Sequence, residues 1–414
     1  MTPRRPLVVT ALTVCTLVAC DSFTGPPERL EQLPRQLTIA EQEVIASSNA
    51  FAFDLLREEV ARSEPGSNVF ISPFSVSMAL GMTLNGAAGE TFDSMRTTLR
   101  FEGLTQTQVN ESYRDLLALL VELDGGTTWD VANSVWARQG FPFVPAFFDT
   151  VQDYFGAEAR EMDFGDPATR DVINQWVSDA TNGRIDTIVE SISPLDILFL
   201  INAVYFKGDW TTKFDRDRTA PAPFQSATGS GSIQVETMNA RDMLAGLFHL
   251  GATGIEGGEL PYGNQAFTLT VVMPPHGGSV EDVVAALDDQ AWKSWMEQIS
   301  YDSVHVALPK MEIEYETRLD SVLMTLGMGV AFDANRSDFS NLTPAQDAHI
   351  SRVRHKTFLK VDEEGTEAAA ATSVDIGLTS LPQGLYVDRP FILAIRERLS
   401  GTILFLGVIR DPRG

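Results

Sequence analysis

The sequence has 414 residues, of which 44% are hydrophobic and 21% charged, an ordinary composition for a globular protein with a large core. Its 31 basic and 56 acidic residues give a formal net charge of −25. This balance argues against binding of nucleic acid, which needs a basic face, and against electrostatic attraction to anionic lipids.

The first twenty residues, "MTPRRPLVVTALTVCTLVAC", have the layout of an export signal. Two arginines precede an apolar run over 7–18 that is too short to span a bilayer. The ending "LVAC" resembles a bacterial lipobox, so we expect a signal peptide over 1–19 and a lipidated Cys20. The alternatives are an ordinary secretory signal cut nearby, or a buried helix. The lipobox predicts an exported protein, lipid-anchored to the bacterial cell envelope on its periplasmic or outer surface, with the lipid as its only membrane contact.

Cys15 and Cys20 are the only cysteines in the chain. The part after residue 20 therefore has no disulfide framework, thiolate metal site or cysteine nucleophile. The stretch that follows is polar and contains Gly25, Pro26, Pro27 and Pro34, which predicts a flexible tether over 20–45. One large domain is expected over 46–414, because no repeat or second linker follows.

Helices are predicted mainly in the first half of this domain. Residues 47–62 have apolar positions at helical spacing after a serine cap signal, and 72–87 begin at Ser-Pro and are nearly all apolar, which indicates a central helix. Residues 105–123 are amphipathic, and 167–183 begin with proline and end in Asn-Gly, the favoured start and stop chemistry.

After Pro194 the pattern changes to runs rich in Val, Ile, Leu and Phe, which predict strands over 195–210, 267–275, 304–310 and 391–410. The last run is expected to be a hairpin that turns at Ser400 and Gly401. Helices followed by strands are typical of an α+β fold.

Motifs of known enzyme classes are missing from the sequence. It has no G-x-S-x-G, H-E-x-x-H, Walker-type loop or G-x-G-x-x-G, and its five histidines do not have metal-ligand spacing. We therefore expect no catalytic residues, no metal and no cofactor.

The segment "VDEEGTEAAAATS" at 361–373 places small residues between strongly apolar runs. As a strand, it would present only small groups to each face, and such a strand could enter a packed sheet without displacing much of its core. Gly365 would provide a hinge. Composition alone favours an alanine-rich surface helix or a loop.

Several motifs together resemble the serpins, the serine protease inhibitor superfamily. The resemblance covers about residues 47–411 and rests on "NVFISPFSVSMALGMTLNGAAGET", "FLINAVYFKGDWTTKF", "LPKMEIE", "HKTFLKVDEEGTEAAAAT" and "DRPFILAIRERLSGTILFLGVI". It implies a single domain in which helices pack on a large mixed or antiparallel central sheet beside smaller sheets, with an exposed reactive-centre loop. It also implies an irreversible suicide-substrate inhibitor: the protease forms an acyl-enzyme with the loop, which then inserts into the main sheet.

The resemblance assigns roles to particular residues. The inserting hinge would comprise Glu363, Glu364, Gly365, Thr366, Glu367, Ala368, Ala369, Ala370, Ala371 and Thr372. Because large, charged or proline residues there slow insertion, the small residues favour an inhibitor over a non-inhibitory serpin that acts as a binding or structural protein, which is the alternative.

The family's loop length places the reactive bond. Sixteen residues after Glu363, and eleven before Pro390, both lead to Thr379, so cleavage is expected between Thr379 and Ser380, flanked by Leu378 and Leu381. Threonine suits the small primary pocket of an elastase- or subtilisin-like protease. A register one residue earlier would expose Leu378 to chymotrypsin-like enzymes.

Two supporting groups follow from the same resemblance. The shutter, which controls opening of the main sheet, would be Ser72, Ser75, Asn202 and His355, and the breach, where the loop enters, would be Trp210, Lys310 and Glu363. An ion pair between Lys310 and Glu363 is expected. The expected partner is a target serine protease bound to a monomer. Heparin is not expected to bind, because the corresponding helix offers only Arg96 and Arg100.

Overall fold

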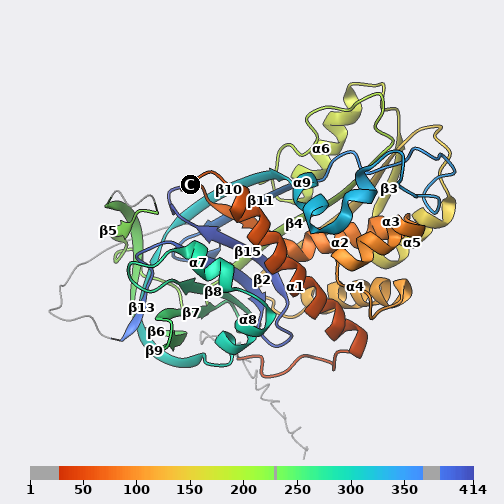
Figure 1. Cartoon of the computed structure of the whole chain (residues 1–414). Coiled ribbons are helices and arrows are strands. Elements are labelled where there is room, and N and C mark those ends of the chain that lie inside the picture. Colours follow the sequence, from red (N-terminus) through yellow and green to blue (C-terminus); the bar gives the residue numbers. More distant parts are fainter. Residues whose placement is uncertain (1–27, 228–230, 367–382) are drawn as a thin grey trace, which may run out of the picture.

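The computed structural model describes residues 28–227, 231–366 and 383–414, which form one α+β domain (Figure 1). Its helices in the described chain are α1 (Ile39–Arg62), α2 (Pro73–Leu84), α3 (Gly89–Thr98), α4 (Gln106–Val121), α5 (Pro145–Phe155), α6 (Ala168–Ala180), α7 (Val280–Ala286), α8 (Asp289–Met296) and α9 (Asp320–Leu323), the last continued by the short turns η1 (Met324–Met328) and η2 (Gly329–Phe332). None of these helices is long and apolar enough to cross a membrane.

The first helix begins eight residues before the expected start at Ser47. Its N-cap is Thr38, whose hydroxyl accepts from the backbone of Glu41 while the Glu41 carboxylate accepts from the backbone of Thr38. This capping box satisfies two donors at the helix start. The start predicted at Ser47 was wrong because a serine inside a helix cannot be told from an N-cap serine by sequence alone. Ser47 lies inside α1.

The segment before α1 differs from the flexible tether expected over 20–45. The Leu30 amide donates to the Asn264 carbonyl at 2.9 Å, and the Arg398 guanidinium donates to the Leu30 carbonyl at 2.5 Å. Three leucines, at 30, 33 and 37, pack against the core. The described residues 28–45 are therefore part of the domain, because these leucines outweigh the prolines and polar residues that indicated a tether.

The predicted central helix is confirmed as α2, with Pro73 in its first turn and most of its residues buried. The predicted helices over 105–123 and 167–183 correspond to α4 and α6. α4 buries the apolar face expected from its spacing, including Val109, Tyr113 and Leu116.

The larger of the sheets has the order β1-β15-β14-β8-β7-β6-β9-β13, with β5 beside β6, within the described residues. Its strands are β1 (Val69–Ile71), β5 (Ala220–Gln225), β6 (Ser232–Leu250), β7 (Ile255–Pro261), β8 (Phe267–Met273), β9 (Ser300–Pro309), β13 (Gly384–Tyr386), β14 (Phe391–Glu397) and β15 (Ile403–Ile409). The predicted hairpin is β14–β15, which turns at Ser400 and Gly401.

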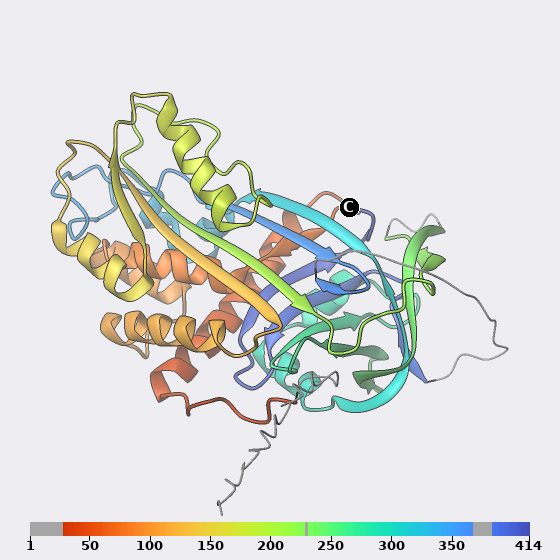
Figure 2. The same ribbon diagram turned by 180° about the vertical axis from the view of Figure 1, so that it is seen from behind.

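Two smaller sheets carry the rest. One has the order β12-β4-β2-β3, made of β2 (Thr127–Arg138), β3 (Glu158–Met162), β4 (Leu198–Asp209) and β12 (Gly365–Thr366); the other pairs β10 (Met311–Arg318) with β11 (Arg354–Val361). Figure 2 shows the long strands β2 and β4, with α6 lying over one end, and β11 and β10 beyond them.

The two smaller sheets face each other along the edges of β4 and β11. Gly365 pairs with Asp209, at the carboxyl end of β4, and it follows closely the carboxyl end of β11 at Val361. At the other end, Asp196 precedes β4 and bonds to Arg352, which precedes β11. The two strands therefore run in the same direction, and within the described residues no ladder of hydrogen bonds joins them.

Candidate functional site

The hinge leaves β11 through a tight turn over 362–365. The Asp362 amide donates to the Gly365 carbonyl at 2.9 Å, and the Glu364 amide donates to the Asp362 carboxylate at 3.0 Å. Gly365 has a φ of 153°, and a Cβ at this position would lie 2.0 Å from the Gly208 carbonyl oxygen. Only glycine fits here, because both the backbone angle and the close approach to β4 exclude a side chain.

The breach residues are brought together around this turn. Lys310 donates to both carboxylate oxygens of Glu363, at 2.8 and 3.0 Å, and Thr219 donates to the same group at 2.7 Å. Burial raises the pKa of the Glu363 carboxyl, but the hydrogen bonds from Lys310 and Thr219 outweigh it and hold this pKa below its ordinary value. The expected ion pair is thus present, and Glu363 is held ionised although its side chain is only 3% exposed.

Trp210 anchors the hinge backbone. Its indole nitrogen donates to the Asp362 carbonyl at 2.9 Å, and its amide donates to the Glu364 carbonyl, also at 2.9 Å. Its ring stacks on Tyr262 with centroids 4.5 Å apart, and the Tyr262 hydroxyl bonds to that of Thr366 at 2.8 Å. Thr366 therefore points into the core, which fixes which face of the hinge is the inner one.

The four shutter residues lie where the start of α2 meets the two smaller sheets, with Asn202 on β4 and His355 on β11. The Ser72 amide donates to His355 Nε2 at 2.9 Å, and its hydroxyl donates to the Leu404 carbonyl at 2.8 Å. The Ser75 hydroxyl donates to the Asn202 side chain. Burial lowers the pKa of His355 to about 4, so the ring is neutral at pH 7 and accepts the bond from Ser72.

Sequence reasoning missed three residues of this arrangement: Thr219, Tyr262 and Asn133. The Asn133 side chain accepts from Asn202 at 2.7 Å and donates to the Phe155 carbonyl at 2.7 Å, which extends the shutter network into β2. None of the three belongs to a motif that the sequence displays, since each reaches the site only through the pairing of distant strands.

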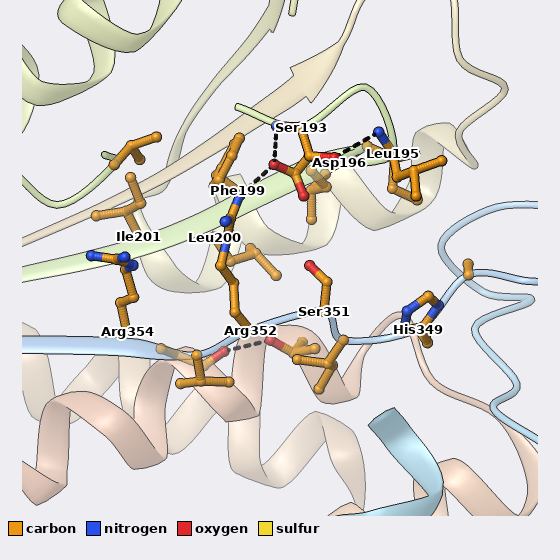
Figure 3. A pocket seen from close by; sticks show the side chains of 18 of the residues that line it. Ser193, Leu195, Asp196, Phe199, Leu200, Ile201, His349, Ser351, Arg352 and Arg354 are labelled. Carbon is orange, nitrogen blue, oxygen red and sulfur yellow. Dashed lines mark hydrogen bonds and ion pairs between the residues drawn. The ribbon is translucent and has the colours of Figure 1, made fainter. Parts of the chain in front are cut away.

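A cavity of about 660 Å³ lies between β4 and β11, on the side of the gap away from the hinge. Figure 3 shows side chains from both sides of it, with Phe199, Leu200 and Ile201 on β4 facing Arg352 and Arg354. Residues of α2 and the shutter line it as well. The gap between the strands is thus a preformed space with hydrogen-bonding strand edges on both sides.

Several predicted residues lie outside the described part of the chain. These are the hinge residues Glu367–Thr372, the reactive-bond region Leu378, Thr379, Ser380 and Leu381, and Cys20. Across residues 28–227, 231–366 and 383–414, no three His, Cys, Asp or Glu side chains come together as a metal site would require.

Most of this chain is similar in sequence to known proteins. The family model described as "Serpin (serine protease inhibitor)" matches residues 46–412. Human leukocyte elastase inhibitor is 30% identical, with 89% of this chain and all of that protein covered, and an uncharacterized serpin-like protein of Thermococcus kodakarensis is 34% identical over 90% of this chain and 87% of its own length.

Solved structures resemble the fold over most of its length. The thermophilic serpin tengpin in its native state superposes with a TM-score of 0.80 and 28% identity, covering 93% of this chain and 97% of that one. Human thyroxine-binding globulin, solved with thyroxine, has a TM-score of 0.81 and 26% identity, covering 91% and 100%. The likeness therefore extends over most of the described helices and sheets.

Proposed function

This chain belongs to the serpin family, and we propose that it is an irreversible suicide-substrate inhibitor of serine endopeptidases of the elastase or subtilisin type. The protease's serine oxygen attacks the Thr379 carbonyl, the Thr379–Ser380 bond breaks, and the Ser380 amine leaves with the C-terminal piece. An ester then joins Thr379 to the protease. Insertion of the segment before Thr379 between β4 and β11 drags the protease with it and deforms its active site before water cleaves the ester.

The observation that carries this proposal is the register of β12 on β4. Gly365 pairs with Asp209 and Thr366 with Gly208, so the two numbers in each pair add to 574. If the strand continues in this register, residue 372 lies opposite Asn202 and residue 378 opposite Asp196. Residues 365–376 would therefore cover the whole of β4, and the segment up to the expected reactive bond would run three residues past Leu198.

The alternation of residues along the segment fits the same register. Because Thr366 points into the core and side chains alternate in a strand, the even-numbered residues would face inward. These are Thr366, Ala368, Ala370, Thr372, Val374, Ile376 and Leu378, and the odd-numbered set is Glu367, Ala369, Ala371, Ser373, Asp375, Gly377 and Thr379. Apolar and small residues inside, with the acids outside, are what an inserted strand needs.

The residues around the expected reactive bond support the choice of protease class. Residues 363–387 contain no lysine or arginine, so a protease that requires a basic primary residue is disfavoured. Threonine at 379 fits a small, neutral pocket, with Leu378 and Leu381 as neighbours. A relative that bears the name leukocyte elastase inhibitor is consistent with this class.

The proposed site of action is the bacterial cell surface. An exported chain lipidated at Cys20 would place the inhibitor at the envelope, where it protects surface proteins from foreign or endogenous proteases. Labelling with a radioactive fatty acid tests this: incorporation is expected in the wild type and lost in Cys20→Ala.

The test of the inhibitory function is incubation with elastase- and subtilisin-like proteases. We expect an SDS-stable complex and a released C-terminal peptide, whose measured mass should match a fragment that starts at Ser380. If the proteases cut the loop and continue to turn over, without complex, the proposal fails.

A second candidate function is a non-inhibitory serpin that acts as a binding protein. The likeness to thyroxine-binding globulin keeps this candidate open, although what that protein binds is said of it alone. The two candidates differ after loop cleavage, because only an inserting chain gains stability.

A further inference from the structure

The end of the gap opposite the hinge is closed by an ion pair. Asp196 lies two residues before β4 and Arg352 two residues before β11, and their side chains bond directly across the gap (Figure 3). The Asp196 side chain is 7% exposed and that of Arg352 is 26% exposed. Arg352 also donates to the Ser191 carbonyl at 3.2 Å.

The Asp196 side of this pair is held rigidly. Its carboxylate accepts from the Ser193 amide at 2.7 Å, and its carbonyl accepts from the Arg138 guanidinium at 2.8 Å. Arg138 lies at the end of β2, so the loop that carries Asp196 is tied to the four-stranded sheet. Arg352 is tied instead to the segment that leads into β11, and its guanidinium lies 5.6 Å from the Phe199 ring.

The register of β12 on β4 predicts where an inserted strand would end. Residue 378 would lie opposite Asp196, because 378 and 196 add to the same 574 as the observed pairs. Cross-strand neighbours share a face and approach within about 5 Å. Leu378 would therefore arrive beside a buried carboxylate whose partner reaches it from the far side of the strand's path.

We propose that the Asp196–Arg352 ion pair is a latch that must open for the last residues of the loop to insert. Asp196 and Arg352 are positioning residues in this role, since they act on the strand edges and touch no reacting atom. The inference rests on the proposed function, because it requires insertion. The ion pair makes the final step of insertion, by residues 374–379, slower than the entry of the small residues at 367–372.

A second ion pair crosses the same gap but lies at the surface. Arg354 donates to Glu190 at 2.6 Å, and the Glu190 side chain is 62% exposed. Solvent screening makes such a pair weak. The buried pair is the one that an arriving leucine must displace, and it is the one to test.

The test separates insertion from inhibition. The full chain is nicked after residue 379 by a metalloprotease, which forms no acyl-enzyme, and pulsed hydrogen exchange with mass spectrometry follows the amides of 367–372 and 374–379 separately. In the wild type we expect the first group to become protected before the second. In Asp196→Asn and Arg352→Met, protection of 374–379 should be roughly threefold to tenfold faster, with 367–372 unchanged.

Two matched variants control this result. Arg352→Lys keeps the charge and should retain the slow final step. Glu281→Gln removes a partly buried ion pair with Arg410 that does not cross the gap, and it should leave both groups unchanged. In a serine protease assay, Asp196→Asn should also bring the number of inhibitor molecules consumed per trapped protease closer to one.

The outcomes are distinct. If Asp196→Asn and Arg352→Met leave the timing of 374–379 unchanged, or speed both groups equally, the latch is overturned. If the wild type inserts with the two-step timing but traps no serine protease, the proposed function fails while the latch stands. If the nicked wild type never protects the loop amides, both are wrong.

Discussion

Individual side chains in this protein hold charges and polar groups beside the gap between the two smaller sheets. Glu363 is buried and ionised beside Lys310, and His355 is buried and neutral beside the Ser72 amide. A buried polar group is tolerated only with its partner, so each such pair stabilises the native arrangement as long as its partner is present.

Lowering the pH should destabilise the native protein through His355. Its pKa is about 4 in the folded chain because of burial, against 6.5 as the ordinary value, so the unfolded state binds a proton first. Stability is then lost as the pH falls from about 6.5 to 4, by about 3 kcal/mol at most. The urea midpoint of the wild type should fall over this range more steeply than that of His355→Gln, which does not titrate. Equal slopes would contradict this.

Removing the partner of Glu363 should weaken the anchoring of the hinge. In Lys310→Met the carboxylate keeps only Thr219 and backbone donors, so its pKa should rise and the free energy of unfolding should fall by roughly 1–2 kcal/mol. Urea unfolding at pH 7.5 measures the loss. Lys293→Met, which removes an exposed pair with Asp289, is the control and should change stability by less than about 0.5 kcal/mol.

At the scale of elements, the pairing of β12 with β4 sets the register that an inserting hinge would follow. The sequence alone predicted the existence of β4, the hairpin β14–β15 and the helices α2, α4 and α6, because each has a strong apolar period or a clear end signal. It did not single out β2 or β6, because buried polar residues such as Asn133 and Ser134 interrupt the apolar run of β2, and β6 mixes buried and exposed positions. Their place depends on strand pairing, which no local pattern encodes.

The inward and outward faces of the hinge should respond differently to charge. Ala370→Lys places an ammonium at an inward position opposite Val204, whereas Ala369→Lys places it at the outward position opposite Tyr205. The first should convert the inhibitor largely into a substrate, with at least about a tenfold loss of covalent complex, because burying an unpaired charge is costly. The second should retain most of the complex. Gel quantification of complex against cleaved chain measures both, and equal losses would refute the register.

For the whole molecule, the central fact is that no ladder of hydrogen bonds joins β4 to β11 within the described residues and that a cavity lies between these two strands. The candidate site was predictable as far as motifs reach: the shutter residues, the breach and the ion pair of Lys310 with Glu363 are close together as expected. The cavity, the Asp196–Arg352 ion pair and the partners Thr219, Tyr262 and Asn133 were not predictable, because they form only where segments distant in the sequence meet. The reactive bond stays a prediction.

The nicked protein should be more stable than the intact one. Insertion would bury Val374, Ile376 and Leu378 and pair a new strand on both edges, which contributes on the order of 10 kcal/mol before ordering entropy is subtracted. The midpoint of thermal unfolding should rise by roughly 10 °C or more. Scanning calorimetry of intact and nicked chains measures this, with a chain nicked after residue 379 that carries Ala370→Lys as the control. An unchanged midpoint in the nicked wild type would mean that no strand forms.

The hydrogen bonds of Leu30 with Asn264 and Arg398 shorten the connection between Cys20 and the folded domain. If Cys20 carried a lipid in a bilayer, ten residues would separate it from Leu30, a distance of about 35 Å at full extension. The domain would then be confined to a thin layer above the lipid. It would contact only those proteases that approach the membrane surface closely.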